Sequence, residues 1–102
     1  MQYEKVEKDY FINIEKDEKV METLTRFCKD RGIKNAKLSG IGAVKKTEIG
    51  AYDLPEQEYI KRKYPEILEL LSFEGNVALK DGEPFIHAHV VLSDHEMRTL
   101  GG

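Results

Sequence analysis

The chain has 102 residues and a mass of 11.7 kDa, which suits one small domain and leaves no room for a second core. Hydrophobic residues make up 40% and charged residues 34%, a mixture typical of a folded domain with a charged surface and not of a disordered chain. Sixteen Lys and Arg against nineteen Asp and Glu give a net charge of -3. This balance excludes a surface that is basic throughout, while a local basic patch stays compatible with it.

The single cysteine, Cys28, excludes an internal disulfide and a cysteine-rich zinc site. The first residues, 1–5, are charged and no apolar run follows them, so they do not resemble a signal peptide. No stretch approaches the roughly 20 apolar residues of a membrane span. We therefore expect a cytoplasmic protein without a membrane partner.

The first third of the chain predicts a strand followed by the principal helix. Residues 10–14 are β-branched and aromatic, and the charged residues 4–9 extend that strand with one wet face. The helix is expected over about 18–31, with Asp17 as N-cap and Gly32 as the C′ residue. One apolar stripe follows helical spacing: Val20, Met21, Leu24, Phe27 and Cys28. We interpret Cys28 as a small core residue.

The rest of the chain predicts consecutive strands. They are expected over residues 36–44, 47–53, 58–64, 66–74 with a continuation through 77–79, and 85–92. Gly75 is interpreted as a bulge or a turn, and residues 80–83 as an Asp-Gly turn. Strands in succession with one segregated helix indicate an α+β fold, a single domain with a mainly antiparallel sheet.

One helix can cover only one face of such a sheet. The strands carry more apolar residues than it can hide, namely Ile12, Ile49, Leu68, Leu70, Phe73, Val90 and Leu92. We therefore predict self-association through the sheet, as a small oligomer.

A Gly-x-Gly pattern at Gly40 and Gly42, preceded by Ser39, is a weak candidate for a ligand-binding loop. A dinucleotide-binding fingerprint needs a third glycine and a helix that begins there, whereas this chain has Lys45 and then a predicted strand. The alternative is a strand kink or close backbone packing, which glycine permits because it lacks Cβ.

His87 and His89 are the sharpest chemical feature. Two residues apart in a strand, they leave the same face and can share a divalent metal, most readily zinc, if a third ligand comes from elsewhere. The candidate third ligands are His95, Asp94, Glu83 and Asp53. The alternative interpretation is a pair of partly buried histidines that form hydrogen bonds across strands.

The remaining polar residues form no motif that is specific for a catalytic or binding site. No nucleophile and base pair, and no acid and base pair, is apparent, so no catalytic residue is predicted and an enzyme is not favoured. The tight cationic clusters are Lys45-Lys46 and residues 61–63, the second flanked by Tyr59 and Tyr64. Aromatic residues beside cations can bind single strands by stacking, but solvated charges on an edge strand give the same pattern.

Taken together, the motifs resemble a known family, the PPC domain (plants and prokaryotes conserved domain), which also occurs beside AT-hooks in plant nuclear proteins. The resemblance covers residues 10–102 and rests on motifs in the right order: Phe27-Cys28 through Gly32-Ile33, residues 38–44, residues 50–53, residues 66–70, residues 75–77 and residues 82–94. It implies an α+β domain that assembles as a homotrimer.

The resemblance also implies a DNA-linked role, and for some prokaryotic members a metal. The AT-hook core Arg-Gly-Arg-Pro is missing, because the one Arg-Gly pair, Arg31-Gly32, is followed by Ile33. The family tends to carry a third histidine directly after a Gly-Gly pair, whereas here Gly101-Gly102 end the sequence. We therefore expect one PPC-like domain over residues 1–102 without the family's last strands, with His95 as a substitute third ligand.

Two functions follow as hypotheses. The first is a non-enzymatic, oligomeric interaction or regulatory module that binds DNA without an AT-hook. The second is a protein that binds zinc or a small ligand, either as a binding protein or as an enzyme, with a site around His87, His89 and the Gly40–Gly42 segment. The sequence names no substrate, DNA sequence or effector.

Overall fold

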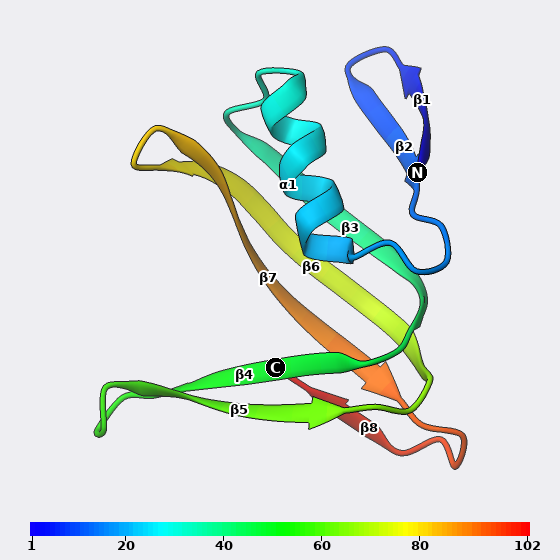
Figure 1. Ribbon diagram of the computed structural model, residues 1–102, viewed down its shortest axis with the longest axis vertical. Helices are drawn as coiled ribbons and strands as arrows, with labels where there is room; N and C mark the ends of the chain where they lie inside the picture. Colours follow the sequence, from blue (N-terminus) through cyan, green and yellow to red (C-terminus); the bar gives the residue numbers. More distant parts are fainter. The chain divides into compact units, whose positions relative to one another are not determined.

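The computed structural model describes residues 1–102, with one helix and eight strands (Figure 1). In chain order these are β1 (Gln2–Val6), β2 (Asp9–Asn13), α1 (Val20–Asp30), β3 (Ala36–Val44), β4 (Thr47–Asp53), β5 (Glu58–Tyr64), β6 (Leu68–Lys80), β7 (Glu83–Ser93) and β8 (Thr99–Gly101). They form a four-stranded sheet in the order β3-β6-β7-β8 and two separate pairs, β1-β2 and β4-β5. The predicted α+β fold with mainly antiparallel strands and one principal helix is confirmed. The helix is too short to cross a membrane.

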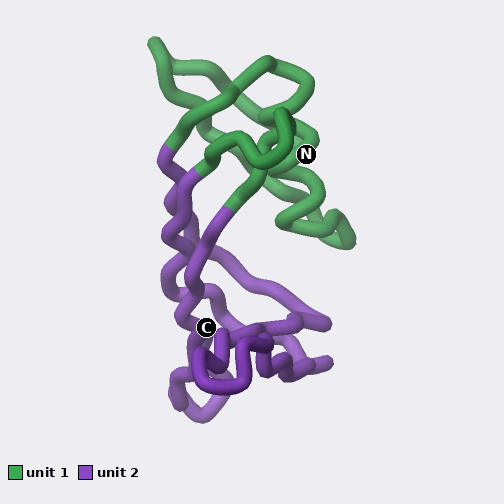
Figure 2. Tube along the Cα trace, turned by 90° about the vertical axis from the view of Figure 1, so that its left-hand side faces the viewer, with its two compact units in different colours: residues 1–36, 77–86 green, residues 37–76, 87–102 purple.

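The chain divides into two compact units, which Figure 2 colours separately. Unit 1 comprises residues 1–36 and 77–86, and unit 2 comprises residues 37–76 and 87–102. The long strands β6 and β7 contribute residues to both units.

In unit 1, the strand predicted over residues 10–14 is confirmed as β2, whereas its predicted extension through residues 4–9 is wrong, because the chain turns back on itself there. Strands β1 and β2 pair antiparallel from Gln2 opposite Asn13 to Val6 opposite Asp9. The turn between them needs a positive φ, which Glu7 adopts at 56°. Residues other than glycine rarely adopt a positive φ, and hairpin turns that need one usually carry Gly, Asn or Asp. A glutamate at this position therefore gives no sequence signal for a turn.

The ends of α1 differ in how well the sequence predicts them. The N-cap is Lys19 and not Asp17, because Asp17 has a φ of 70° and lies in the turn before the helix. Glu18 also lies outside the helix, and a hydrogen bond from the N-terminal ammonium, 2.6 Å away, lowers its pKa together with one from the Glu15 N–H. The predicted C′ glycine is confirmed: Gly32 has a φ of 64°, and the Ile33 N–H donates to the Cys28 carbonyl.

The core of unit 1 joins the helix to the β1-β2 pair through aromatic rings and one cation. The ring of Phe27 meets those of Tyr3 and Tyr10 edge-on, at 5.3 and 5.0 Å between centroids. The Arg31 guanidinium stacks over Phe27 at 3.8 Å and over Tyr3 at 4.1 Å. Cys28 is buried, as predicted for a core residue, and burial raises the pKa of its thiol. The thiol is therefore uncharged and unreactive near neutral pH.

In unit 2, the core is formed by Ile49 of β4, Leu68 of β6 and Leu92 of β7. Partly buried hydrophobic residues pack around these three: Val44, Tyr64, Leu70, Val90 and Leu100. This corrects the sequence prediction that Ile49, Leu68 and Leu92 need cover from another copy, because the chain's own segments bury them. The β4-β5 hairpin and the unpredicted strand β8 contribute to this cover.

Strand β8 returns along β7 through a loop that Asp94 holds. Its carboxylate accepts hydrogen bonds from the backbone N–H groups of Glu96 and Arg98, and from Nε of Arg98. These hydrogen bonds lower the pKa of Asp94, and the bond from the Arg98 backbone N–H has the largest effect. Past β8, Gly102 exchanges two backbone hydrogen bonds with Val90, so pairing with β7 reaches the last residue.

Candidate functional site

Strand β7 has one buried and one exposed face, and the exposed face carries the histidines. Ile86 and Leu92 point into the core, whereas His87 and His89 are exposed. The two rings lie 5.2 Å apart between centroids, at an interplanar angle of 54°. The prediction that both imidazoles leave the same face of a strand is confirmed, and they are available to a ligand.

Gly75 of β6 lies against the backbone that carries these histidines. A Cβ at Gly75 would stand 2.7 Å from the His87 carbonyl oxygen and 2.9 Å from the Ala88 Cβ. Glycine is therefore required here, because any side chain would push β7 away. Gly75 is not a turn: β6 runs unbroken from Leu68 to Lys80, and its burial pattern changes phase between Ser72 and Phe73.

The third metal ligand predicted from the sequence is not brought to the pair. No group of three or more His, Cys, Asp or Glu side chains lies close enough to hold a metal ion together. His95 is exposed in the loop after β7, and Asp94 is committed to that loop's hydrogen bonds. The chain by itself thus offers two neighbouring imidazoles.

The predicted ligand segment at Ser39, Gly40 and Gly42 lies within β3, at one edge of the four-stranded sheet. All three residues are exposed, and a Cβ on either glycine would meet nothing within 4 Å. A turn and strand β4 follow, not a helix, so a dinucleotide loop is absent as expected. Close packing within the chain does not explain these glycines. The segment presents open backbone at a sheet edge.

The β4-β5 hairpin supplies a second exposed face. Its register pairs Tyr52 with Tyr59, Gly50 with Lys61 and Glu48 with Lys63, and paired residues share a face. Tyr64, which the sequence placed with the cationic cluster, belongs to the opposite face and packs against the core. Tyr52 is far from the cationic cluster in sequence, but its cross-strand pairing with Tyr59 brings it to the same face as Lys61 and Lys63.

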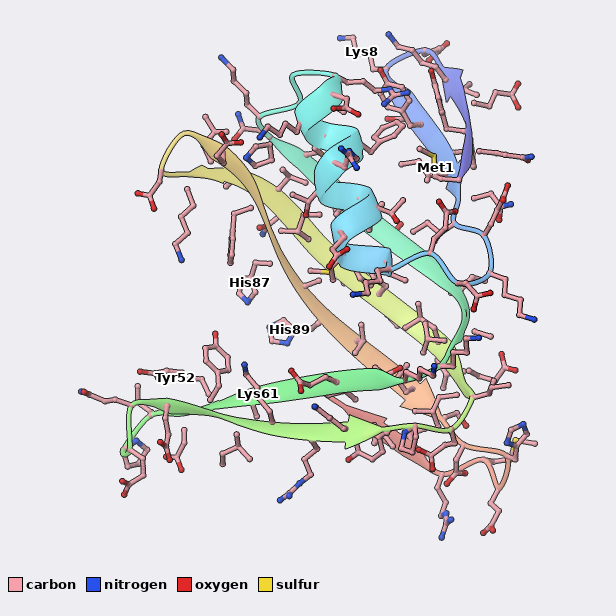
Figure 3. All side chains as sticks on the ribbon, viewed as in Figure 1. Met1, Lys8, Tyr52, Lys61, His87 and His89 are labelled. Carbon is pink, nitrogen blue, oxygen red and sulfur yellow. The ribbon has the colours of Figure 1, made fainter.

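Figure 3 shows how these two faces of unit 2 are oriented. The labelled side chains of His87 and His89 point from β7 toward the hairpin, and those of Tyr52 and Lys61 point from the hairpin toward β7. The opposite face of the hairpin meets β8 at a small hollow lined by Ile60, Arg62 and Leu100, among others. Sequence reasoning missed this hollow because it missed β8.

Comparison with known families gives the chain's identity. The family model of the Plants and Prokaryotes Conserved (PCC) domain, called PPC above, matches residues 1–102. The chain belongs to this family. Among curated proteins, no relative matches it.

Two solved structures are more than 40% identical to the chain. A plant- and prokaryote-conserved protein of Pyrococcus horikoshii is 43% identical over 80% of the chain, with a TM-score of 0.79. A "metal-containing protein" of Archaeoglobus fulgidus is 42% identical over 81%, with a TM-score of 0.76. The present chain spans 57% and 59% of those two chains, respectively.

Two further structures match over more of the chain at lower identity. A "putative DNA-binding protein" of Ralstonia eutropha is 28% identical over 98% of the chain and 69% of its own, with a TM-score of 0.91. A protein of Bacteroides thetaiotaomicron with the same description is 23% identical over 99% of the chain and 71% of its own. Its TM-score of 0.95 establishes the likeness of fold.

Proposed function

We propose that this PPC domain is an oligomeric interaction module that binds DNA without an AT-hook. The observation that carries the proposal is the membership in the PPC family, together with the description of the Ralstonia relative as a "putative DNA-binding protein". Exposed apolar residues support the oligomer, and the exposed cations of β5 support contact with a polyanion. The proposal divides into these two parts, each with its own test.

The apolar residues that argue for an oligomer are those the chain leaves uncovered. Ile41, on the edge strand β3, is 82% exposed. Phe85 and Val91 are half-exposed and share the face of β7 that carries the histidines. An edge strand with free backbone groups and a large apolar side chain invites pairing with another chain. We propose that a second and a third copy cover these residues, in the homotrimer that the family resemblance implies.

The mass in solution tests the oligomer. We expect light scattering after size exclusion to give three times the 11.7 kDa of one chain at micromolar concentration. Ile41→Lys should lower this mass, because a charge would be buried at the interface. Leu54→Lys, at the equally exposed tip of the hairpin, should leave it unchanged. A wild-type monomer would refute the oligomer.

The cations that argue for DNA lie on β5. Lys61, Arg62 and Lys63 are exposed, and none forms an ion pair within the chain. They are therefore free to neutralise phosphates, although the net charge of -3 limits long-range attraction. Because each phosphate contact releases counterions, binding through these three cations must weaken as the salt concentration rises.

Titration of a labelled duplex at two salt concentrations tests this part. With about three phosphate contacts, affinity should fall roughly 40-fold between 50 and 200 mM salt. Arg62→Gln should weaken binding and flatten the salt dependence, whereas Lys16→Gln, which removes one exposed charge far along the chain, should not. No binding at the lower salt concentration would overturn the DNA function.

A zinc site at His87 and His89 is the second candidate, favoured by the exposed pair of imidazoles and by the metal-containing Archaeoglobus relative. The two histidines are chemically suitable ligands, because neutral imidazole binds zinc well. They supply only two of the ligands that a zinc ion needs, so the others must come from outside the residues described here. Bound zinc would supply a Lewis acid or a structural crosslink at this face.

Elemental analysis of protein purified after growth with zinc tests the site. We expect close to stoichiometric zinc, its loss in His87→Ala, and no loss in His95→Ala, since His95 lies apart from the pair. About a tenth of an equivalent or less in the wild type would refute the zinc site, given how tightly complete sites hold this metal. Equal losses in both variants would show that His95 is a ligand after all.

A further inference from the structure

The face of the β4-β5 hairpin opposite Ile49 and Tyr64 gathers aromatic and cationic side chains that have no partner in the chain's core. The antiparallel register places Tyr52, Tyr59, Lys61 and Lys63 on this face, with Gly50 between them. We call these four side chains the tyrosine-lysine face. The zinc site does not involve it. Of the three cations argued above to contact phosphates, Lys61 and Lys63 lie on this face, whereas Arg62 lies on the opposite one.

The tyrosines are exposed although each has a large apolar ring. Tyr52 is 50% and Tyr59 64% exposed, and the rings meet edge to face with centroids 5.2 Å apart. Tyr59 leans over Gly50, where a Cβ would stand 3.5 Å from its Cδ1 atom. The two rings therefore hold each other in position and leave ring surface open to solvent. Planar groups such as bases stack on rings arranged in this way.

The cations continue the same face along β5. Lys61 and Lys63 alternate with residues of the opposite face, so their Cα atoms lie about 7 Å apart along the strand. Neither lysine forms an ion pair. Glu48 is the one acidic residue on this face, whereas Asp53, Glu56 and Glu58 gather at the tip of the hairpin. A polyanion that follows the strand from Tyr59 to Lys63 thus meets two rings and then two cations.

The histidines of β7 are further exposed side chains with rings in unit 2. Tyr52 and Lys61 point toward β7, and His87 and His89 point toward the hairpin (Figure 3). Imidazole rings can stack on a base or donate to a phosphate oxygen. The groups of both strands are therefore suited to one and the same ligand class, one with planar rings and phosphates.

We propose that the tyrosine-lysine face binds single-stranded nucleic acid, with bases stacked on Tyr52 and Tyr59 and the phosphates contacted by Lys61 and Lys63. This inference rests on the proposed nucleic-acid function and specifies which form of nucleic acid is bound and through which residues. A single strand fits better than a duplex, because the bases of a duplex are already stacked on one another and cannot reach the rings. Exposed tyrosines also suit a contact between two copies of the chain, and the experiments below distinguish such a contact from nucleic-acid binding.

Fluorescence anisotropy with labelled dT15 measures the binding, with rU15 and a duplex of equal length as comparison probes. We expect dT15 to bind more tightly than the duplex. Tyr52→Ala/Tyr59→Ala should weaken binding about tenfold or more, since one stacked base contributes that much. Tyr52→Phe/Tyr59→Phe should keep most of the affinity, because phenylalanine retains the ring. The rU15 probe tells whether RNA shares the site.

Charge variants separate phosphate contacts from a general loss of charge. Lys61→Gln/Lys63→Gln should reduce the slope of log K against log salt by about 1.4, the value for two contacts to a single strand. Lys8→Gln/Lys16→Gln, an equal loss of charge in unit 1, should leave that slope unchanged. Circular dichroism and melting temperature verify that all variants fold, and an unchanged salt slope of the lysine variant refutes the inference even if the alanine pair does not fold.

The outcomes distinguish this inference from the function on which it rests. Duplex binding without dT15 binding refutes the single-strand inference alone, whereas binding of neither probe refutes both. Equal affinity of the alanine and phenylalanine pairs for dT15 refutes the stacking. A lower oligomer mass of the alanine pair, with dT15 affinity unchanged, shows that the face is a contact between copies and also refutes the inference.

Discussion

The packing of Ile49 against Leu68 and Leu92 is the constraint on which unit 2 depends. These three side chains come from β4, β6 and β7, elements far apart in sequence, and they are the buried members of one cluster. Without that contact the β4-β5 pair would be an isolated two-stranded hairpin, which is at best marginally stable in water. Because alternate residues of a strand point to opposite faces, burying Ile49 also fixes where Tyr52 and Lys61 point. A hydrophobic contact on one face therefore determines the chemistry available on the other.

The same alternation governs β7. Burial of Ile86 and Leu92 leaves His87 and His89 on the solvent side, beside half-exposed Phe85 and Val91. Gly75 lets β6 approach this segment closely enough to hold it in place. The three proposals draw on what this packing exposes: imidazoles for a metal, rings and cations for a nucleic acid, and apolar side chains for further copies. All of these groups are exposed because the opposite faces of the same strands are buried.

The sequence predicts well whatever depends on local pattern. Strands 36–44, 47–53 and 58–64 have the predicted bounds, the Gly32 C-cap is confirmed, and so is the shared face of His87 and His89. What it misses depends on contacts between distant residues. The β1-β2 turn at Glu7 carries no glycine or asparagine, and β8 has three residues, one of them glycine, with no apolar alternation to reveal it. The pairing of Tyr52 with Tyr59 follows from a hairpin register that spacing alone does not give, so Tyr64 was placed with the cations instead.

Native-state hydrogen exchange in Ile49→Ala, with Ile60→Ala as the matched control, tests this account most directly. Both residues lie on the same face of the hairpin, but Ile49 is 9% exposed and Ile60 45%. We expect slow exchange of the cross-strand amides of β4 and β5 in the wild type and in Ile60→Ala, and a global loss of about 2–4 kcal/mol with fast hairpin exchange in Ile49→Ala. Equal protection in the two variants, or fast exchange of the hairpin already in the wild type, would contradict the claim that this contact holds the hairpin in place.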